Sequence, residues 1–220
     1  VSVAIDGQSY VDGPNFMYIK AYGILQIRPS TASIQGGSRV TLTGPGVEEY
    51  GQQGSTFGPY RSTRGMACVY VTADRRKLVT PATFMNPIQA DCPTPKTDFA
   101  QNAYVYLSPN YQSDDSQISS TFVRFMFYNI PVLSRVDDPF ASISGGNVVN
   151  VQGSFFLDLD TASCMFGDIS SDWGHIVPAK FVNDGLMQCR VPPAPKPMSV
   201  PFRISLNGQD FSSDAVTFHY

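Results

Sequence analysis

The chain has 220 residues, of which 42% are hydrophobic and 15% are charged, and its formal net charge is −3. This composition is that of a globular protein and excludes the broad basic surface of a nucleic-acid-binding protein. No apolar run approaches the length that spans a bilayer. The 11 tyrosines, 15 phenylalanines, 18 glycines and 17 prolines favour strands joined by tight turns over helices.

The chain opens on a stretch that predicts a hairpin. Residues 1–10 alternate apolar and polar side chains around Asp6-Gly7, and an aromatic strand follows at 16–18. The same order returns around Asn207-Gly208 near the C-terminus, and once more, with a longer turn, in the middle of the chain. We therefore predict that residues 1–21 close a repeat that begins before them. The alternative is an extra hairpin docked on the next domain.

Two complete units follow the hairpin. Each has an edge-like strand ending near a proline, a Gly-Gly turn, and an alternating strand that ends in glycine. Gly36 and Gly145 are 109 positions apart, and so are Gly44 and Gly153. The strand and both of its bounding turns therefore keep register between the units.

The units differ after this strand. The distance is 24 residues from Gly44 to Cys68 and 11 from Gly153 to Cys164, so the earlier unit carries 13 extra residues. Long loops inside compact domains are usually functional or disordered. The glycines, glutamines and serines of this insertion predict flexibility. Its aromatic side chains predict a surface for contacts; they are Tyr50, Phe57 and Tyr60.

Each unit then has one cysteine in a strand and a second cysteine followed by prolines. The spacings are 24 residues from Cys68 to Cys92 and 25 from Cys164 to Cys189. No window shows helical periodicity. Strands of roughly 5–7 residues, separated by Gly, Pro, Asn and Asp, predict an antiparallel sandwich.

This order of turns, cysteines and strands resembles the IPT/TIG domain, the immunoglobulin-like module of plexins, Met-type receptors and fibrocystin-like surface proteins. The domain also occurs in Rel-type transcription factors and in some polysaccharide-processing enzymes. The resemblance implies an all-β chain of tandem immunoglobulin-like (IPT/TIG) β-sandwiches. The expected parts are a closing hairpin at 1–21, a domain at 22–129 with a loop insertion near 45–65, and a domain at 130–220, which matches best.

Four cysteines allow three connectivities. Repeat symmetry selects Cys68–Cys92 and Cys164–Cys189, which are also the within-domain pairs of the receptor branch of the resembling family. Disulfides imply an extracellular or cell-surface location and argue against the transcription-factor branch. The alternative is buried free thiols in a cytosolic protein.

Little in the sequence predicts chemistry. The two histidines, His175 and His219, have no Ser/His/Asp or Cys/His partners at a spacing that supports a catalytic site. We therefore expect no catalytic residue, no cofactor and no enzyme. We interpret the acids around the Cys164 strand as turn residues and assign no metal, with calcium as the alternative; they are Asp158, Asp160, Asp168 and Asp172. The basic run 75–77 is interpreted as a solvated turn, with an acidic partner as the alternative.

The predicted function is a non-catalytic extracellular structural or adhesion module. Short linkers at 20–23 and 129–131 favour a semi-rigid rod within a larger cell-surface or secreted protein. We expect protein partners at the cell surface or self-assembly, no nucleic acid and no direct membrane insertion. The candidate contact residues are Tyr50, Phe57, Tyr60 and Trp173, the last of which could instead belong to the core.

Three alternatives stay open at this point. The first is a segment of a plexin- or Met-type receptor ectodomain. The second is an accessory domain of a carbohydrate-active enzyme. The third is a Rel-like pair that binds nucleic acid, which would need a basic loop set at the domain joint.

Overall fold

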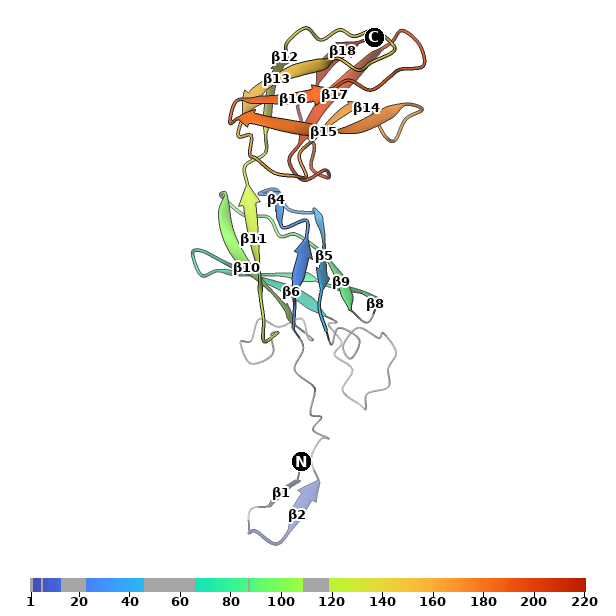
Figure 1. Cartoon of the computed structure of the whole chain (residues 1–220). Coiled ribbons are helices and arrows are strands. Elements are labelled where there is room, and N and C mark those ends of the chain that lie inside the picture. Colours follow the sequence, from blue (N-terminus) through green and yellow to red (C-terminus); the bar gives the residue numbers. More distant parts are fainter. Residues whose placement is uncertain (1, 5, 13–22, 46–65, 87, 109–118) are drawn as a thin grey trace.

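The structure is a computed structural model, and it describes residues 2–4, 6–12, 23–45, 66–86, 88–108 and 119–220. Every regular element in these ranges is a β-strand, and together they hold the 18 strands β1 to β18. None of the described residues forms a helix long and apolar enough to cross a bilayer. Two sandwiches stack end to end, and a small hairpin lies at the far N-terminal end (Figure 1).

The hairpin joins β1 (Ser2–Ala4) to β2 (Tyr10–Asp12), with Ser2 opposite Asp12. Its turn contains Gly7 in the left-handed region, at φ 73°. The turn is fixed by the carboxylate of Asp6, which accepts hydrogen bonds from the backbone N–H groups of Gln8 and Ser9. The predicted aromatic strand at 16–18 lies outside the described residues.

The first sandwich consists of two facing sheets. One sheet has the order β3-β5-β9-β8 and the other β4-β11-β10-β6-β7. The chain changes sheets at Pro29, because β3 pairs with β5 whereas β4 pairs in parallel with β11. The strands are β3 (Gln26–Arg28), β4 (Thr31–Ser33), β5 (Arg39–Thr43), β6 (Ala67–Thr72), β7 (Lys77–Pro81), β8 (Thr83–Asn86), β9 (Gln89–Pro93), β10 (Gln101–Ser108) and β11 (Val123–Tyr128).

The second sandwich repeats this design with one continuous strand where the first has two. Its strand order is β12-β13-β16-β15-β14-β17-β18. The long strand β15 pairs with β14 through residues 174–178 and with β16 through residues 179–183, so it links the two sheets. The strands are β12 (Val132–Val136), β13 (Val148–Ser154), β14 (Ser163–Gly167), β15 (Gly174–Asn183), β16 (Leu186–Arg190), β17 (Ser199–Ser205) and β18 (Val216–His219).

The crossing between sheets has the same hydrogen bond in both sandwiches. The Ala82 N–H donates to the carbonyl of Met66, and the Ala179 N–H donates to the carbonyl of Ala162, each at 2.9 Å. Each alanine follows a proline, and an aromatic residue comes two positions later, at Phe84 and Phe181. This Pro-Ala-x-Phe repeat, 97 positions apart, is a further sequence signal of the two matched units, beside the glycines and cysteines.

A disulfide joins the two sheets of each sandwich. Cys68 on β6 is bonded to Cys92 on β9, and Cys164 on β14 is bonded to Cys189 on β16. All four cysteines are at most 1% exposed. Cys68 and Tyr70, two positions apart on β6, both belong to the core of the first sandwich. The bonded pairs are those that repeat symmetry selects.

Candidate functional site

The structure describes one of the four predicted contact residues. Tyr50, Phe57 and Tyr60 lie outside the described residues, so their role stays a prediction. Trp173 is half-buried and packs against the second core. Its ring meets Tyr220 edge-on, with 5.4 Å between ring centroids.

The acid next to this tryptophan shapes a turn. Asp168 Oδ1 accepts hydrogen bonds from the N–H of Ser170 at 2.9 Å and from its hydroxyl at 2.7 Å. These bonds, led by that of the hydroxyl, lower the pKa of the Asp168 carboxyl. In the described part of the chain, no three His, Cys, Asp or Glu side chains come close enough to hold a metal ion. Asp168 thus acts as a turn residue.

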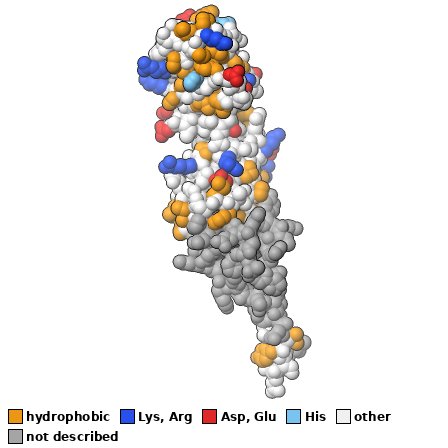
Figure 2. All heavy atoms as spheres, turned by 90° about the vertical axis from the view of Figure 1, so that its right-hand side faces the viewer, with side chains coloured by type: hydrophobic (Ala, Val, Ile, Leu, Met, Phe, Trp, Pro, Cys, Tyr) orange, Lys and Arg blue, Asp and Glu red, His pale blue; other side chains and the backbone are white. Residues whose placement is uncertain are grey.

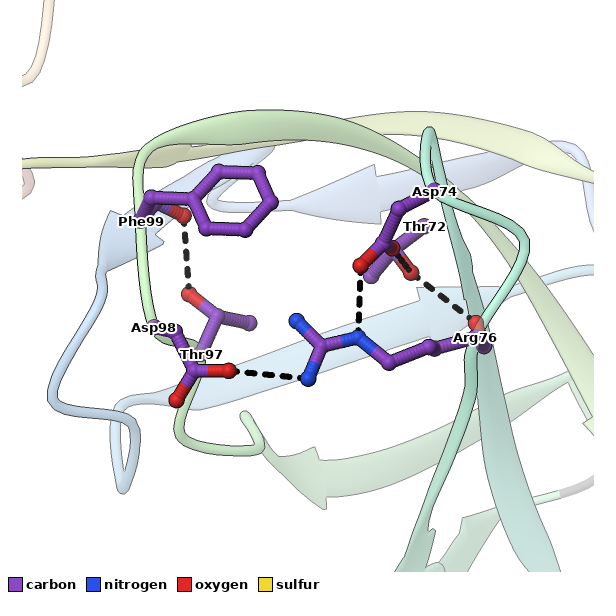
Figure 3. Close-up of polar contacts among 6 residues, drawn as sticks. All are labelled: Thr72, Asp74, Arg76, Thr97, Asp98 and Phe99. Carbon is purple, nitrogen blue, oxygen red and sulfur yellow. Dashed lines mark hydrogen bonds and ion pairs between the residues drawn. The ribbon is translucent and has the colours of Figure 1, made fainter.

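The predicted basic run contains an arginine that pairs with its own chain. Arg76 donates from Nε to Asp74 Oδ2 at 2.6 Å and from Nη1 to Asp98 Oδ2 at 2.8 Å (Figure 3). The Thr72 hydroxyl bonds to Asp74 and to the Arg76 carbonyl. The Arg76 guanidinium also lies 6.0 Å from the centre of the Phe99 ring.

This network has a structural role. The Asp98 hydrogen bond, followed by that of Asp74, raises the pKa of the Arg76 guanidinium. The Thr72 bond, in turn, lowers the pKa of Asp74. Arg76 therefore ties the β6–β7 turn to the loop before β10, and its charge is already matched by two carboxylates.

Three aromatic side chains form a ladder on the outer face of the first sandwich. The Phe122 ring lies 4.7 Å from the Tyr104 ring and 5.6 Å from the Tyr106 ring, measured between centroids. Tyr104 is 44% exposed and Phe122 is 49% exposed. Arg124 lies opposite Tyr104 on the neighbouring strand. Exposed aromatic residues and arginine are typical anchors of protein interfaces.

The sequence contained a signal for this ladder. Residues 103–107 alternate, and the buried residues Ala103, Val105 and Leu107 face the core. Alternation therefore places Tyr104 and Tyr106 on the outer face. Tyr104, Tyr106 and Phe122 were not among the predicted contact residues.

The two sandwiches meet at a joint in which a side chain of the first sandwich packs in the core of the second. Tyr128 ends β11 of the first sandwich, yet its side chain belongs to the core cluster of the second. It is 2% exposed, and its hydroxyl has no hydrogen-bond partner among the described residues. Burial, aided by the negative charge of Asp210, raises the pKa of Tyr128.

A turn of the second sandwich closes the same joint. Gln209 Oε1 accepts from the Arg39 N–H at 2.9 Å, and Gln209 Nε2 donates to the Arg39 carbonyl at 2.9 Å. Asp210 Oδ2 accepts from the Ser38 hydroxyl at 2.5 Å and from the Ser33 N–H at 3.3 Å. These bonds span 170 to 177 positions of sequence, so only the stacking of the two sandwiches creates them.

An open groove of about 290 Å³ lies beside the joint. Phe155 and Leu157 of the second sandwich line it, facing Met126 and Gln101 of the first. Both polar atoms of the Gln101 side-chain amide are buried without a hydrogen-bond partner among the described residues. Figure 2 shows both sandwiches as one column, with hydrophobic atoms reaching the surface of each and charged side chains scattered.

One serine and one histidine also come together. Ser199 Oγ lies 2.8 Å from His219 Nδ1, and the two residues are direct partners on β17 and β18. Phe140 stacks on the histidine ring, with 5.3 Å between centroids. A hydroxyl and an imidazole are two parts of a nucleophilic triad. No described carboxylate hydrogen bonds to this ring, and the pair is exposed at a sheet edge, so the geometry is that of a cross-strand contact.

Comparison with known proteins identifies part of the chain. The sequence profile of the IPT/TIG domain matches residues 131–220. A comparison with curated protein sequences gives no match. Among solved structures, domains 1 to 10 of the plexin A4 extracellular region match 92% of this chain, with a TM-score of 0.52 and 15% identity. The chain spans 16% of the length of that plexin chain.

Two further structures are more distant. Domains 1 to 8 of plexin A4 match 88% of this chain and 24% of their own, with a TM-score of 0.33 and 11% identity. The Escherichia coli adhesin FdeC matches 90% of this chain and 62% of its own, with a TM-score of 0.30 and 12% identity. Both fits are too loose to support an argument about this chain.

The match to the first plexin A4 structure concerns the fold alone, because the identity is low. It agrees with the two stacked β-sandwiches described above, and its coverage of 92% of this chain extends over both of them. The IPT/TIG profile covers the whole second sandwich, from Pro131, just before β12, to Tyr220, just after β18. Residues 131–220 of this chain are therefore an IPT/TIG domain, preceded by a sandwich of the same immunoglobulin-like design.

Proposed function

We propose that this chain is a non-catalytic segment of a larger extracellular protein, in which tandem IPT/TIG domains form a stiff rod and offer surfaces for protein contact. The observation that carries this proposal is the joint between the sandwiches. Domains in one chain move relative to one another unless their interface is extensive and apolar. This joint combines a buried aromatic side chain with a set of directed hydrogen bonds.

Three features of the joint favour stiffness. Tyr128 is inserted in the core of the second sandwich, so a rotation of the domains would expose its ring. Gln209 bonds to both main-chain groups of Arg39, which fixes its direction. The carboxylate of Asp210 accepts bonds from Ser38 and Ser33, and bonds to a charged acceptor are stronger than neutral ones.

The extracellular location rests on the cysteines. Two buried disulfides in a chain with four cysteines favour an oxidising compartment. The plexin A4 fold match comes from an extracellular region, which supports the same location. We also propose that the first sandwich is an IPT/TIG domain within 22–129 and that residues 1–21 close a preceding repeat.

Contact with a partner protein is proposed for two surfaces. The first is the aromatic ladder of Tyr104, Tyr106 and Phe122 on the first sandwich. The turn that carries Trp173 is the other, with Asp168 holding its shape. The predicted contact residues Tyr50, Phe57 and Tyr60 would add a further contact surface to the first sandwich.

The stiffness is tested by residual dipolar couplings measured on the whole chain. We expect one alignment tensor to fit both sandwiches of the wild type. The Asp210→Ala variant should need two tensors, because its joint loses the charged acceptor. Asp214→Ala is the matched control, since Asp214 is exposed and contributes only its carbonyl to the described hydrogen bonds. Two unrelated tensors in the wild type would overturn the rod.

A segment of a plexin-type receptor ectodomain is the second candidate. The fold match to plexin A4, over 92% of this chain, favours it. In such a receptor, a stiff joint would transmit an orientation along the ectodomain. The test is to replace the corresponding two domains of a plexin ectodomain with this chain and measure whether the spacing of the flanking domains is kept.

A further inference from the structure

The second sandwich has an open edge where β15 begins. Residues 174–178 of this strand pair with β14 on one side, and β16 reaches the strand from Ala179 onward. Among the described residues, no other strand pairs with this first half of β15. It belongs to the longest strand in the described part of the chain, and none of the 10 residues of that strand is buried. We call residues 174–178 the open edge.

The main-chain hydrogen bonds show which groups face the open edge. At the two ends of the β14–β15 ladder, the Trp173 carbonyl accepts from the chain opposite and the Ala179 N–H donates to it. Bonded and non-bonded pairs alternate along an antiparallel ladder, so the odd-numbered residues bond to β14. The even-numbered ones therefore turn their main-chain groups outward. Gly174 and Ile176 each offer an N–H and a C=O, and Pro178 offers a C=O.

The edge strands β12 and β18 are protected in other ways. Beside β18, both main-chain groups of His219 bond to the segment before β13. The pairing of β12 shifts register between Leu133 and Arg135, and such bulges hinder pairing with another chain. The open edge has neither device among the described residues. It also contains no Asp, Glu, Lys or Arg, the charged residues that commonly guard an edge.

The corresponding edge of the first sandwich differs at one position. The repeat of 97 positions aligns β7 with the open edge, and Pro81 corresponds to Pro178. Lys77 then stands where the second sandwich has Gly174. A lysine on an edge strand opposes pairing with another chain. The edge of the second sandwich is thus the better suited of the two to accept a strand.

The open edge is complementary to itself. In an antiparallel pairing of two copies centred on Ile176, the N–H and C=O of this residue bond to the same groups of the other copy. Gly174 then lies opposite Pro178, so its N–H meets a carbonyl, and the proline, which lacks an N–H, faces the residue without a side chain. Ile176 is 43% exposed and would pack against its counterpart.

The residues around the open edge agree with this register. Asp172 and Lys180 lie four positions on either side of Ile176, and both are exposed. The pairing therefore brings Asp172 of each copy toward Lys180 of the other, and opposite charges across strands are favourable. Ile169, which is 63% exposed, adds apolar surface, because its N atom lies 2.6 Å from the place of a Cβ on Gly174.

We propose that two copies of this chain associate side by side through the open edge, as antiparallel strands centred on Ile176. A row of outward N–H and C=O groups is matched by an extended strand. The same surface serves both copies, so the contact closes as a dimer about a two-fold axis. β15 lies between the joint and the C-terminal end of the molecule (Figure 1), so the contact does not depend on what precedes or follows this chain. The paired strands are short, and the dimer is therefore weak and depends on protein concentration.

Sedimentation velocity of the whole chain, at increasing concentration, tests the proposal. We expect the weight-average sedimentation coefficient to rise toward that of a dimer. Ile176→Lys places two like charges opposite each other at the two-fold axis and should weaken dimerisation about tenfold. Val182→Lys is the matched control and should dimerise like the wild type, because Val182 is 45% exposed on the same strand but lies outside the open edge.

A cysteine cross-link tests the register. The Cα atoms of a bonded antiparallel pair are about 5.5 Å apart, within the range that a disulfide bridges. Ile176→Cys should therefore give a disulfide-linked dimer under mild oxidation, seen in non-reducing electrophoresis at twice the mass of the chain. The four native cysteines are already paired, so the new thiol is the one that reacts. Val182→Cys is the control and should stay monomeric.

Three results would overturn the proposal. The first is a wild-type chain that stays monomeric at every accessible concentration. The second is a dimer that Ile176→Lys leaves as strong as before. The third is equal cross-linking of Ile176→Cys and Val182→Cys. Asp210→Ala separates this proposal from the rod, because it should loosen the joint in the dipolar couplings and leave dimerisation unchanged; loss of the dimer in this variant would place the contact at the joint instead.

Discussion

Gln209 holds the two sandwiches together through the main chain of Arg39, with both of its amide atoms at 2.9 Å from their partners. The contact therefore does not require any particular side chain at position 39. We predict that Arg39→Ala leaves the relative orientation of the sandwiches unchanged. Gln209→Glu should loosen it, because the carboxylate cannot donate and lies beside the Arg39 carbonyl. Dipolar couplings check both variants, and equal loosening by the two would refute this account of the bond.

The two glycines of the first Gly-Gly turn should respond differently to alanine. A Cβ at Gly36 would lie 2.6 Å from the main chain of Pro95 and Lys96, whereas a Cβ at Gly37 would meet nothing within 4 Å. Both have positive φ, so both substitutions carry strain of about 1–2 kcal/mol. We expect Gly36→Ala to cost about 2 kcal/mol more, from overpacking. Urea denaturation of both variants gives the difference; similar losses would show that the contact relaxes freely.

The Arg76 network should be visible in local exchange. Arg76→Ala removes the link from Asp74 to Asp98 and should speed amide hydrogen exchange in residues 97–99. Arg75→Gly is the control, since Arg75 has φ 64° and glycine adopts that conformation without strain. We expect it to leave this exchange unchanged. The role of the network would be contradicted if exchange at 97–99 became faster in the control, or if it stayed at the wild-type rate in Arg76→Ala.

The disulfides should contribute to stability in both sandwiches. Each closes a loop of about 25 residues, which the chain-entropy model values at about 3 kcal/mol. We expect the double variant Cys164→Ala/Cys189→Ala to lower the free energy of unfolding by about that amount. Non-reducing peptide mapping of alkylated protein should show linked Cys68–Cys92 and Cys164–Cys189 peptides. Four alkylated thiols in freshly isolated protein would overturn the proposed extracellular location.

The buried tyrosines predict a loss of stability at alkaline pH. Burial raises the pKa of Tyr70 and Tyr128 above the value of about 10 that they have when unfolded. Their stabilising contribution is complete below about pH 10 and is lost as the pH rises above it, because the unfolded chain then releases protons first. Urea denaturation at about pH 9 and about pH 11 should show the loss, and Tyr128→Phe should reduce it. Equal stability at both pH values would exclude this linkage.

Much of the fold could be predicted from the sequence because its signals are local. The offset of 109 positions between Gly36 and Gly145 aligned the units, and both glycines have positive φ in the structure. Cys68 was predicted to lie in a strand, and it lies on β6. The predicted all-β class and immunoglobulin-like design are confirmed by the strand orders and by the IPT/TIG match to the second unit.

The candidate surfaces were harder to predict because exposure depends on neighbours that are distant in sequence. Trp173 has a turn-like sequence, yet its ring packs on Tyr220. Phe122 joins Tyr104 only because β10 and β11 pair in one register. The predicted contacts at Tyr50, Phe57 and Tyr60 lie outside the described residues and stay predictions.

The sequence by itself determined the alternating strands, the Gly-Gly turns and the cysteine spacing, because each depends on residues close in the chain or on a repeat of the same pattern. Only the tertiary structure decided the joint. Gln209 meets Arg39 across 170 positions, and Tyr128 enters a core made by the following domain. No propensity or period encodes such contacts, since they arise from the packing of one finished sandwich on the next.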